Sequence, residues 1–285
     1  MQQQEFKQEL IPDTISSSKI NHSRLKQFNR EVENSPYSVK FVTKGKERNK
    51  IENQSFEAIL GQYLIVNAEN QFTIDFDADD YAHELCIYPS KDLVRKAFET
   101  NTSLLEAILE QGKDSEYSFI HRVNQSKNTQ TGKYLERNLP NLITNLEKGH
   151  TVDLDSFFLD LVECIVIDQI NVNQKLVKHS ASKRETKEEL FRRISLAKDF
   201  LTDNFKEKIN IDKVAEMACL SKYHFLRSFK EFYGMSPYQY LLSFKLNEAK
   251  SMRDKGFSYR EISLEVGFSD PKNLRKSMKK RGLMV

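Results

Sequence analysis

Short segments in the first third of the chain alternate hydrophobic and polar residues with a period of two. The clearest is segment 72–77, and segment 39–41 repeats the pattern. Segments 63–66 and 85–88 are short apolar runs. Asn, Asp and Gly stretches separate these segments, and period two places alternate side chains on opposite faces of a strand. Residues 38–89 are therefore predicted to form a small antiparallel β domain, a β-barrel.

Beyond Pro89 the hydrophobic spacing changes to that of helices. Apolar residues at 104–109 mark one predicted helix, and those at 135–146 mark another, which Pro140 breaks or restarts. Segment 154–166 carries an apolar stripe at i, i+3, i+4 spacing. Two interpretations of this stripe stay open: a helix packed on its own β domain, or a helix through which two copies of the chain dimerise.

A polar segment separates this region from the rest of the chain. We interpret residues 171–187 as a linker, because they lack the apolar stripe that precedes them. A length of 285 residues suits about two domains. The expected class is α+β, with a regulatory or dimerisation domain at 1–170 that combines a small β-barrel with helices. An all-α unit is expected at 188–285.

Helical patterns with well-marked ends fill the last hundred residues. Ser236 and Ser258 each begin a helix with the sequence of a capping box, and Gly234 suits a left-handed cap. Pro237 and Pro271 stand at first helical positions. The predicted helices cover 187–205, 211–218, 222–232 and 237–253, and two shorter ones follow Ser258 and Asp270.

A degenerate repeat runs through these helices. The segment from Val214 to Phe225 recurs from Ile262 to Leu274, offset by 48 residues in the turn and 49 in the following helix. In each copy a small residue lets two helices cross closely, a second small residue allows a sharp turn, and a large apolar residue anchors the next helix. This is the pattern of a helix-turn-helix motif. A connecting helix of about 25 Å suits two recognition helices in successive major grooves.

Four motifs carry a family resemblance over about 100 residues. They are S-x-x-x-F-x-x-x-F-K from Ser221 to Lys230, G-M-S-P-x-x-Y ending at Tyr240, the pair Ala249-Lys250, and E-V-G-F-S-D at 265–270. The region resembles the DNA-binding domain of the AraC/XylS family of bacterial transcription regulators. The resemblance implies two helix-turn-helix motifs at the C-terminus and a cupin-like sensor domain before them, for which the sequence shows no specific motif.

The sequence departs from the family pattern at its end. Met278 stands where an aromatic residue is usual, and the chain stops at KKRGLMV, where the family has a further segment and a terminal helix. We therefore expect the second recognition helix to be less firmly anchored than the first. Base specificity is then expected from the first motif and phosphate affinity from the second.

The outward positions of the first recognition helix are the first candidates for DNA contact. The resemblance places Tyr223, Leu226 and Arg227 at base edges. Arg227 can donate two hydrogen bonds to a guanine, whereas Leu226 can make only an apolar contact. Tyr223 either contacts DNA or packs partly into the core. Lys222 and Lys230 complete the outward set.

The second recognition helix offers Lys272, Asn273, Arg275 and Lys276. Asn273 suits adenine and Arg275 suits guanine. Six basic residues lie between Lys272 and Arg281 with no acidic residue among them. The alternative is therefore a basic tail that binds phosphates without sequence preference.

Charge and composition fit this assignment. Residues 186–285 hold 21 Lys and Arg against 13 Asp and Glu, which leaves 23 against 28 for residues 1–185. A basic half suits a polyanion. The three scattered cysteines, the polar N-terminus and the lack of an 18-residue apolar run indicate a cytoplasmic protein.

No catalytic or metal-ligating pattern stands out. The six histidines form no short ligand spacing, there is no glycine-rich phosphate loop, and no Pro-Cys-His site of an alkyl-transfer repair protein is present. We therefore expect no cofactor and no enzyme activity. Two classes remain: a regulator that binds a small-molecule effector in its N-terminal domain, and one whose N-terminal domain serves only dimerisation or protein contact. The expected partners are double-stranded DNA, a second copy of the chain and, for an activator, RNA polymerase.

Overall fold

The computed structural model describes residues 5–9, 18–51, 54–100, 119–148, 150–179 and 183–283. The chain divides into two compact units, Met1–Asn173 and Gln174–Val285. The first combines an antiparallel sheet with helices and the second is all helical, which confirms the α+β class. The helix predicted at 104–109 lies outside the described residues.

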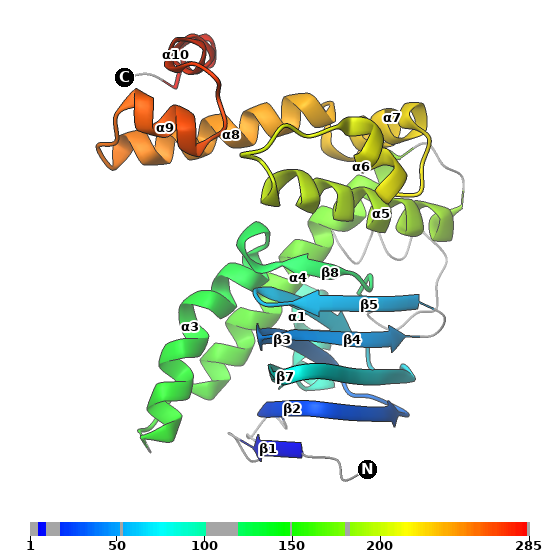
Figure 1. Cartoon of the computed structure of the whole chain (residues 1–285). Coiled ribbons are helices and arrows are strands. Elements are labelled where there is room, and N and C mark those ends of the chain that lie inside the picture. The colour runs from blue at the N-terminus through cyan, green and yellow to red at the C-terminus, as the bar shows by residue number, and fades with distance from the viewer. Residues whose placement is uncertain are drawn as a thin grey trace. The chain divides into compact units, whose positions relative to one another are not determined.

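The sheet of the first unit has eight antiparallel strands (Figure 1). Their hydrogen-bonded order is β1-β2-β7-β3-β6-β8, and β4 pairs with both β5 and β7. The strands are β1 (Glu5–Glu9), β2 (Lys19–Val32), β3 (Ser38–Lys44), β4 (Lys46–Ile51), β5 (Gln54–Ile59), β6 (Gln62–Val66), β7 (Phe72–Tyr88) and β8 (Val123–Gln125). The predicted strand segments 39–41, 63–66, 72–77 and 85–88 all fall on these strands.

The long strand β7 forms the spine of the sheet. It pairs with β2 along one edge, and with β3 and then β4 along the other. The register shifts between Leu25 and Gln27 on β2 and between Val42 and Lys44 on β3. Such irregularities increase twist and bend the strands, so the sheet curls instead of staying flat. Among the described residues the strand path stays open from β1 to β8.

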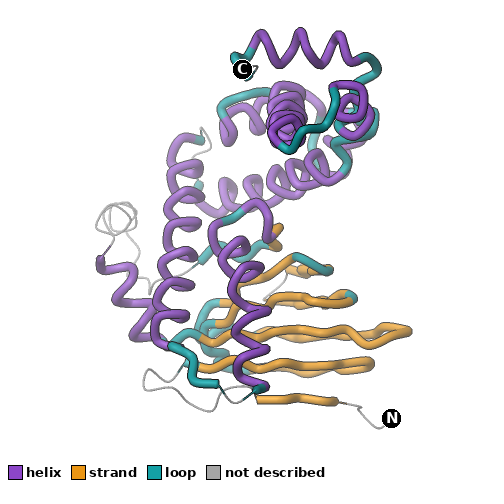
Figure 2. The backbone as a smooth tube through the Cα atoms, turned by 90° about the vertical axis from the view of Figure 1, so that its left-hand side faces the viewer, coloured by secondary structure: helices purple, strands orange, loops and turns teal. Residues whose placement is uncertain are grey.

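Helices cover one face of this sheet (Figure 2). They are α1 (Lys91–Thr100), α3 (Gln130–Glu147) and α4 (Leu154–Lys178), and a short 3₁₀ turn, η1, covers Ser126–Asn128. The shared core joins strand residues such as Ile20, Val39 and Ile87 to the apolar stripe of α4, in which Phe158 and Leu161 are fully buried. The stripe therefore packs on its own β domain, which was one of the two interpretations. Pro140 lies inside α3 without ending it.

The segment that we interpreted as a linker is largely helical. Helix α4 continues to Lys178, and α5 (Arg184–Asp203) begins six residues later. Polar residues around Val172 and Leu176 hid the apolar stripe, which continues through these two buried side chains at i, i+4 spacing. The division between the two units falls inside α4, after Asn173.

The second unit contains helices α5 to α10. After α5 come α6 (Ile211–Met217), α7 (Lys222–Tyr233), α8 (Pro237–Asp254), α9 (Tyr259–Glu265) and α10 (Pro271–Lys280). Each predicted helix of this region is present within a few residues of its expected bounds. Ser236 and Ser258 make the two expected capping boxes, and Gly234 adopts a left-handed conformation with φ of 72°. Local signals therefore set the helix ends here.

Gly267 allows a close approach within this unit. Its φ is +66°, and a Cβ atom at this position would lie 2.1 Å from the carbonyl oxygen of Lys206. Gly234 has a similar φ of +72°, but a Cβ atom there would meet nothing within 4 Å. Alanine at Gly234 would therefore carry only the cost of a left-handed backbone, whereas alanine at Gly267 would also clash with the Lys206 backbone. Comparing the two substitutions separates these two costs.

We expect Gly267→Ala to destabilise the second unit more than Gly234→Ala. Gly234→Ala carries only the left-handed penalty of about 1–2 kcal/mol. Gly267→Ala adds displacement of the Lys206 backbone, so its thermal midpoint falls further. Circular dichroism of the full chain during thermal unfolding measures both shifts. Equal shifts for the two variants would contradict the close approach.

Candidate nucleic-acid interface

The first helix-turn-helix motif consists of α6, a tight turn and α7. Cys219 adopts a left-handed conformation in the turn, with φ of 52°. The backbone N–H of Leu220 donates to the carbonyl of Ala215 at 3.0 Å, which closes the turn. Ser221 then caps α7 by accepting a hydrogen bond from the N–H of His224. A strained but well-bonded turn therefore sets the direction of α7.

The second motif, α9 to α10, repeats this geometry 48 residues later. Gly267 takes the place of Cys219, and the N–H of Phe268 donates to the carbonyl of Ser263 at 2.8 Å. Asp270 caps α10 by accepting from the N–H of Lys272. The same backbone hydrogen bonds at the same offset confirm the repeat that the sequence predicted.

Each recognition helix is anchored by buried apolar residues. Phe225 and Phe229 of α7 are fully buried, with their ring centroids 5.7 Å apart. On α10, Leu274 and Met278 are fully buried in a core with Ile262. Met278 is thus buried where the family usually has an aromatic residue. The buried residues of α7 are Phe225, Ser228, Phe229 and Phe232, against Leu274 and Met278 on α10, so the weaker anchoring of the second helix stays a prediction.

The nine predicted contact residues lie on the outward faces of α7 and α10. Eight are exposed and Leu226 is half-buried. Tyr223 is 77% exposed, so it is not a core residue. The exposed residues are Lys222, Tyr223, Arg227 and Lys230 on α7, and Lys272, Asn273, Arg275 and Lys276 on α10.

Two basic residues of α7 have acidic partners. Lys222 Nζ lies 2.9 Å from an Asp212 carboxylate oxygen, and Arg227 Nε lies 2.9 Å from Glu231 Oε1. These ion pairs raise the pKa of both basic groups, through hydrogen bonding first and charge second. Both side chains are held near the outward face of the helix.

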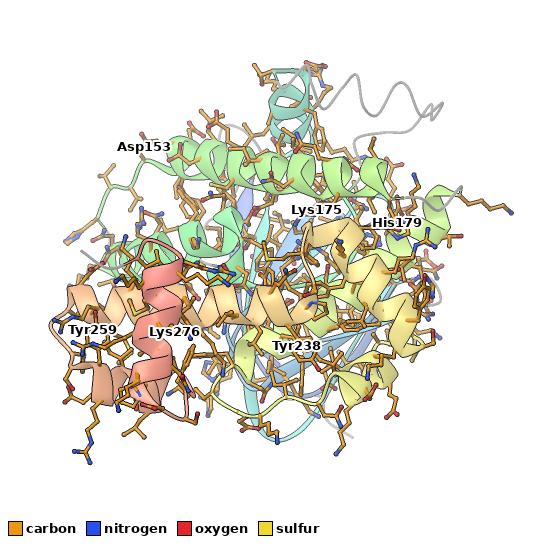
Figure 3. All side chains as sticks on the ribbon, turned by 90° about the horizontal axis from the view of Figure 1, so that it is seen from above. Asp153, Lys175, His179, Tyr238, Tyr259 and Lys276 are labelled. Atoms are coloured by element: carbon orange, nitrogen blue, oxygen red, sulfur yellow. The ribbon has the colours of Figure 1, made fainter. Side chains whose placement is uncertain are left out.

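Arg275 on α10 is oriented in a different way. Its guanidinium carbon lies 4.5 Å from the ring centroid of Tyr259, and that of Arg253 lies 5.0 Å from the same ring. Tyr259 and Lys276 lie toward one end of α8, and His179 lies toward the other (Figure 3). Stacking on a tyrosine leaves the edge of a guanidinium available for hydrogen bonds. Sequence reasoning missed Tyr259, which gave no signal beyond its place in a capping box.

His179 and Glu231 form a second support that the sequence did not indicate. His179 is 6% exposed and stacks on Phe232 with ring centroids 4.4 Å apart. Its Nε2 lies 3.1 Å from Glu231 Oε2, so Glu231 joins His179 to Arg227. Burial lowers the pKa of His179. These residues border a cavity of about 760 Å³ beside α7.

Other chemistry is not evident in the described parts of the chain. No three His, Cys, Asp or Glu side chains gather there in a group that could hold a metal ion. None of the described helices combines the length and apolar character needed to cross a lipid bilayer.

Known proteins resemble both the motif region and a larger part of the chain. Residues 214–282 match the family model of a helix-turn-helix domain. The uncharacterized HTH-type transcriptional regulator YbfI of Bacillus subtilis is 28% identical over 81 residues, which are 28% of this chain and 30% of YbfI. The HTH-type transcriptional activator RhaS of Escherichia coli is 27% identical over 215 residues, 73% of this chain and 70% of RhaS.

A solved structure aligns with nearly the whole chain. ToxT from Vibrio cholerae is 12% identical, and the alignment covers 92% of this chain and 93% of ToxT with a TM-score of 0.37. The motif geometry, the matched family model and the regulator relatives agree on the C-terminal unit. The last hundred residues of this chain form a double helix-turn-helix domain, which matches the helix-turn-helix family model over residues 214–282 and is similar to the HTH-type regulators YbfI and RhaS.

Proposed function

We propose that the protein is a sequence-specific DNA-binding transcription regulator that inserts α7 and α10 into successive major grooves. The repeated turn geometry, with exposed basic and polar side chains on both second helices, carries this proposal. Helix α8 joins the motifs and has 18 residues, a length of about 27 Å. That length is compatible with one DNA turn of about 34 Å between the recognition helices.

Within this proposal, each helix carries side chains that read bases and lysines that bind phosphates. Arg227 reads a guanine, with Tyr223 and Leu226 beside it. On α10, Arg275 and Asn273 suit guanine and adenine. Lys222, Lys230, Lys272 and Lys276 neutralise phosphates. The exposure of Asn273 and Arg275 on α10 supports base reading by the second motif as well.

The first unit is proposed to regulate this activity. In one version it binds a small-molecule effector, and in the alternative it serves only dimerisation or protein contact. A homodimer, contact with RNA polymerase in the case of an activator, and action in the cytoplasm belong to the same proposal. A cavity of about 220 Å³ in the first unit, lined by residues that include Asn21, Lys40 and Cys86, favours the effector version.

We expect Arg227→Ala to abolish discrimination at one base pair of a selected operator. The operator is first obtained by selection from random duplexes with the full chain. Loss of a bidentate arginine–guanine contact costs about 1–3 kcal/mol, roughly fivefold to 150-fold in the ratio of dissociation constants. Fluorescence anisotropy with single-base variants of the operator measures this ratio.

Lys276→Ala is the matched control for Arg227→Ala. It is expected to weaken binding to all DNA sequences alike and to reduce the magnitude of the slope of log K against log salt concentration by about 0.9. If Arg227→Ala leaves base preference intact, the base-reading assignment is wrong. If the wild-type chain selects no sequence at all, the proposed function itself is wrong.

Glu231→Gln is expected to reduce the preference at the Arg227 base pair about twofold, because it removes the charge that restrains the guanidinium. Glu189→Gln is the control, since Glu189 binds Arg193 Nε at 2.8 Å with the same i, i+4 spacing on α5. The same anisotropy titrations measure both variants. Equal effects of the two substitutions would show that Glu231 has no special role in base preference.

A further inference from the structure

A row of polar side chains crosses the sheet on the face opposite the helices. Asn21 on β2 pairs in register with Cys86 on β7, and Cys86 pairs with Lys40 on β3. One residue along each strand, Ile20, Ile87 and Val39 point to the helix-covered core instead. The polar row is therefore a consequence of strand alternation and not a packing irregularity.

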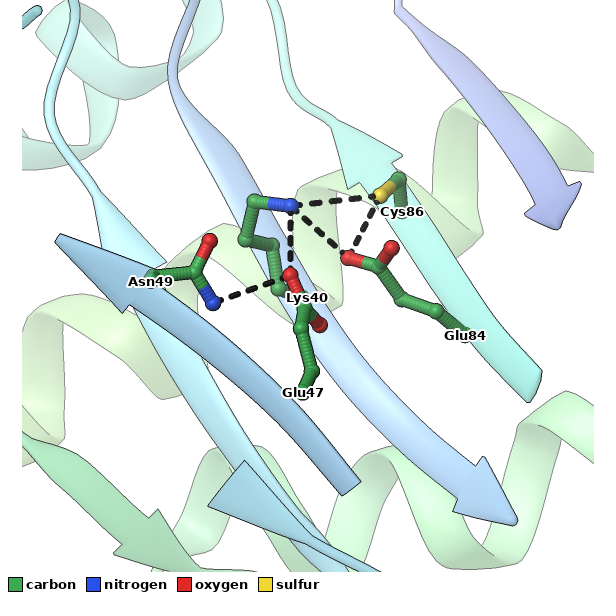
Figure 4. Close-up of polar contacts among 5 residues, drawn as sticks. All are labelled: Lys40, Glu47, Asn49, Glu84 and Cys86. Atoms are coloured by element: carbon green, nitrogen blue, oxygen red, sulfur yellow. Dashed lines mark hydrogen bonds and ion pairs between the residues drawn. The ribbon is translucent and has the colours of Figure 1, made fainter. Parts of the chain in front are cut away.

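Lys40 lies at the centre of this row and is only 2% exposed (Figure 4). Its Nζ lies 2.9 Å from Oε1 of Glu84 and 2.9 Å from Oε1 of Glu47. Burial, together with the charge of Glu84, raises the pKa of Glu47 to about 8. Glu84 has a lowered pKa beside Lys40, so Glu47 is the more easily protonated of the two carboxyl groups.

A cavity of about 220 Å³ opens on this polar row. At about 30 Å³ for each water in the liquid, this volume equals about seven water molecules. Phe72, Ile74 and Val32 form an apolar part of the wall, and polar side chains form the rest. The cavity therefore suits a small molecule and is too small for a long chain or a large ring system.

Two buried polar oxygens in the cavity wall, an amide oxygen that accepts and a hydroxyl that can both accept and donate, have no hydrogen-bond partner among the described residues. They are Oδ1 of Asn21 and Oγ of Ser38, on side chains that are 3% and 2% exposed. An unsatisfied buried polar atom costs about 1–3 kcal/mol. Both oxygens can be satisfied by a molecule that donates O–H or N–H groups.

The charges of the wall favour an anion. Lys19, Arg30 and Lys40 line the cavity together with a single carboxylate, that of Glu84, which is engaged by Lys40. Lys19 and Arg30 therefore leave the wall with an excess of positive charge. The planar guanidinium of Arg30 suits a carboxylate, which it can bind through two hydrogen bonds. An ammonium group on the ligand is disfavoured beside these cations.

We propose that this cavity binds a small hydroxy acid, whose carboxylate pairs with Arg30 and Lys19 and whose hydroxyl groups donate to Asn21 and Ser38. The ligand class deepens the proposed function by identifying the effector that the first unit recognises. Binding itself involves no DNA, so it is tested separately from DNA recognition.

Isothermal titration of the full chain with glycerate, malate and gluconate tests the class. Three probes of similar size to glycerate isolate each feature: propionate lacks the hydroxyls, glycerol lacks the charge, and serine carries an added ammonium. At least one hydroxy acid is expected to bind, and glycerate is expected to bind more tightly than all three comparison probes.

Substitutions then locate the site. Arg30→Gln and Ser38→Ala are each expected to weaken binding of the hydroxy acid that has the highest affinity. Arg30→Gln is expected to raise its dissociation constant about tenfold, because a charge-assisted hydrogen bond is lost. Arg48→Gln, on the exposed side of β4 and outside the cavity wall, is the control and is expected to leave binding unchanged. Ser38→Ala leaves the net charge unchanged and the side-chain volume nearly so, and we therefore expect this variant to fold. Its thermal midpoint, compared with that of the wild-type chain, checks this.

Several outcomes would overturn the proposal. No binding by any of the three acids rejects the class, as does serine or propionate binding as tightly as glycerate. Equal loss of affinity in Arg30→Gln and Arg48→Gln rejects the location. A chain that binds the acid but selects no DNA sequence would instead refute the proposed function and leave this site standing.

Discussion

The position of both recognition helices depends on one left-handed residue in each turn. Cys219 and Gly267 have φ of 52° and 66°, and the backbone hydrogen bonds around them recur at an offset of 48 residues. A left-handed residue reverses the chain within a few atoms, so the second helix leaves at a steep angle from the first. If the turn had a different backbone conformation, the outward residues of α7 would face a different direction. Substituting side chains on α7 could not correct the orientation of the helix.

The two turns meet this requirement at different cost. Gly267 adopts positive φ without strain and also admits the Lys206 backbone, whose carbonyl leaves no room for a Cβ atom. Cys219 adopts the same left-handed conformation although it has a Cβ atom, so the first turn is strained. Packing of the buried Phe225 and Phe229 offsets this strain. The first motif therefore combines a strained turn with an aromatic core, and the second combines an unstrained turn with the core of Ile262, Leu274 and Met278.

Local signals explain why the DNA-binding unit could be predicted so fully from sequence. Each of these signals involves residues only a few positions apart. Examples are the helix caps at Ser236 and Ser258 and the small residues of each turn. His179 and Glu231 are 52 residues apart and meet only through the packing of the unit, so no short pattern could reveal them. At the end of helix α4 a local signal was missed: Val172 and Leu176 are buried at i, i+4 spacing, but the polar residues around them suggested a linker.

The polar face of the sheet was hidden from sequence for a related reason. Asn21, Lys40 and Cys86 are brought together only by the register of three strands. From the sequence alone, Lys40 would be interpreted as an exposed lysine of an alternating strand. A buried ion pair contributes little to stability, because desolvation offsets its attraction. The helix-covered face, with its continuous apolar core, already stabilises this unit. Stability thus gives no reason to keep the buried pair of Lys40 and Glu84 on the other face, whereas recognition of a polar ligand does.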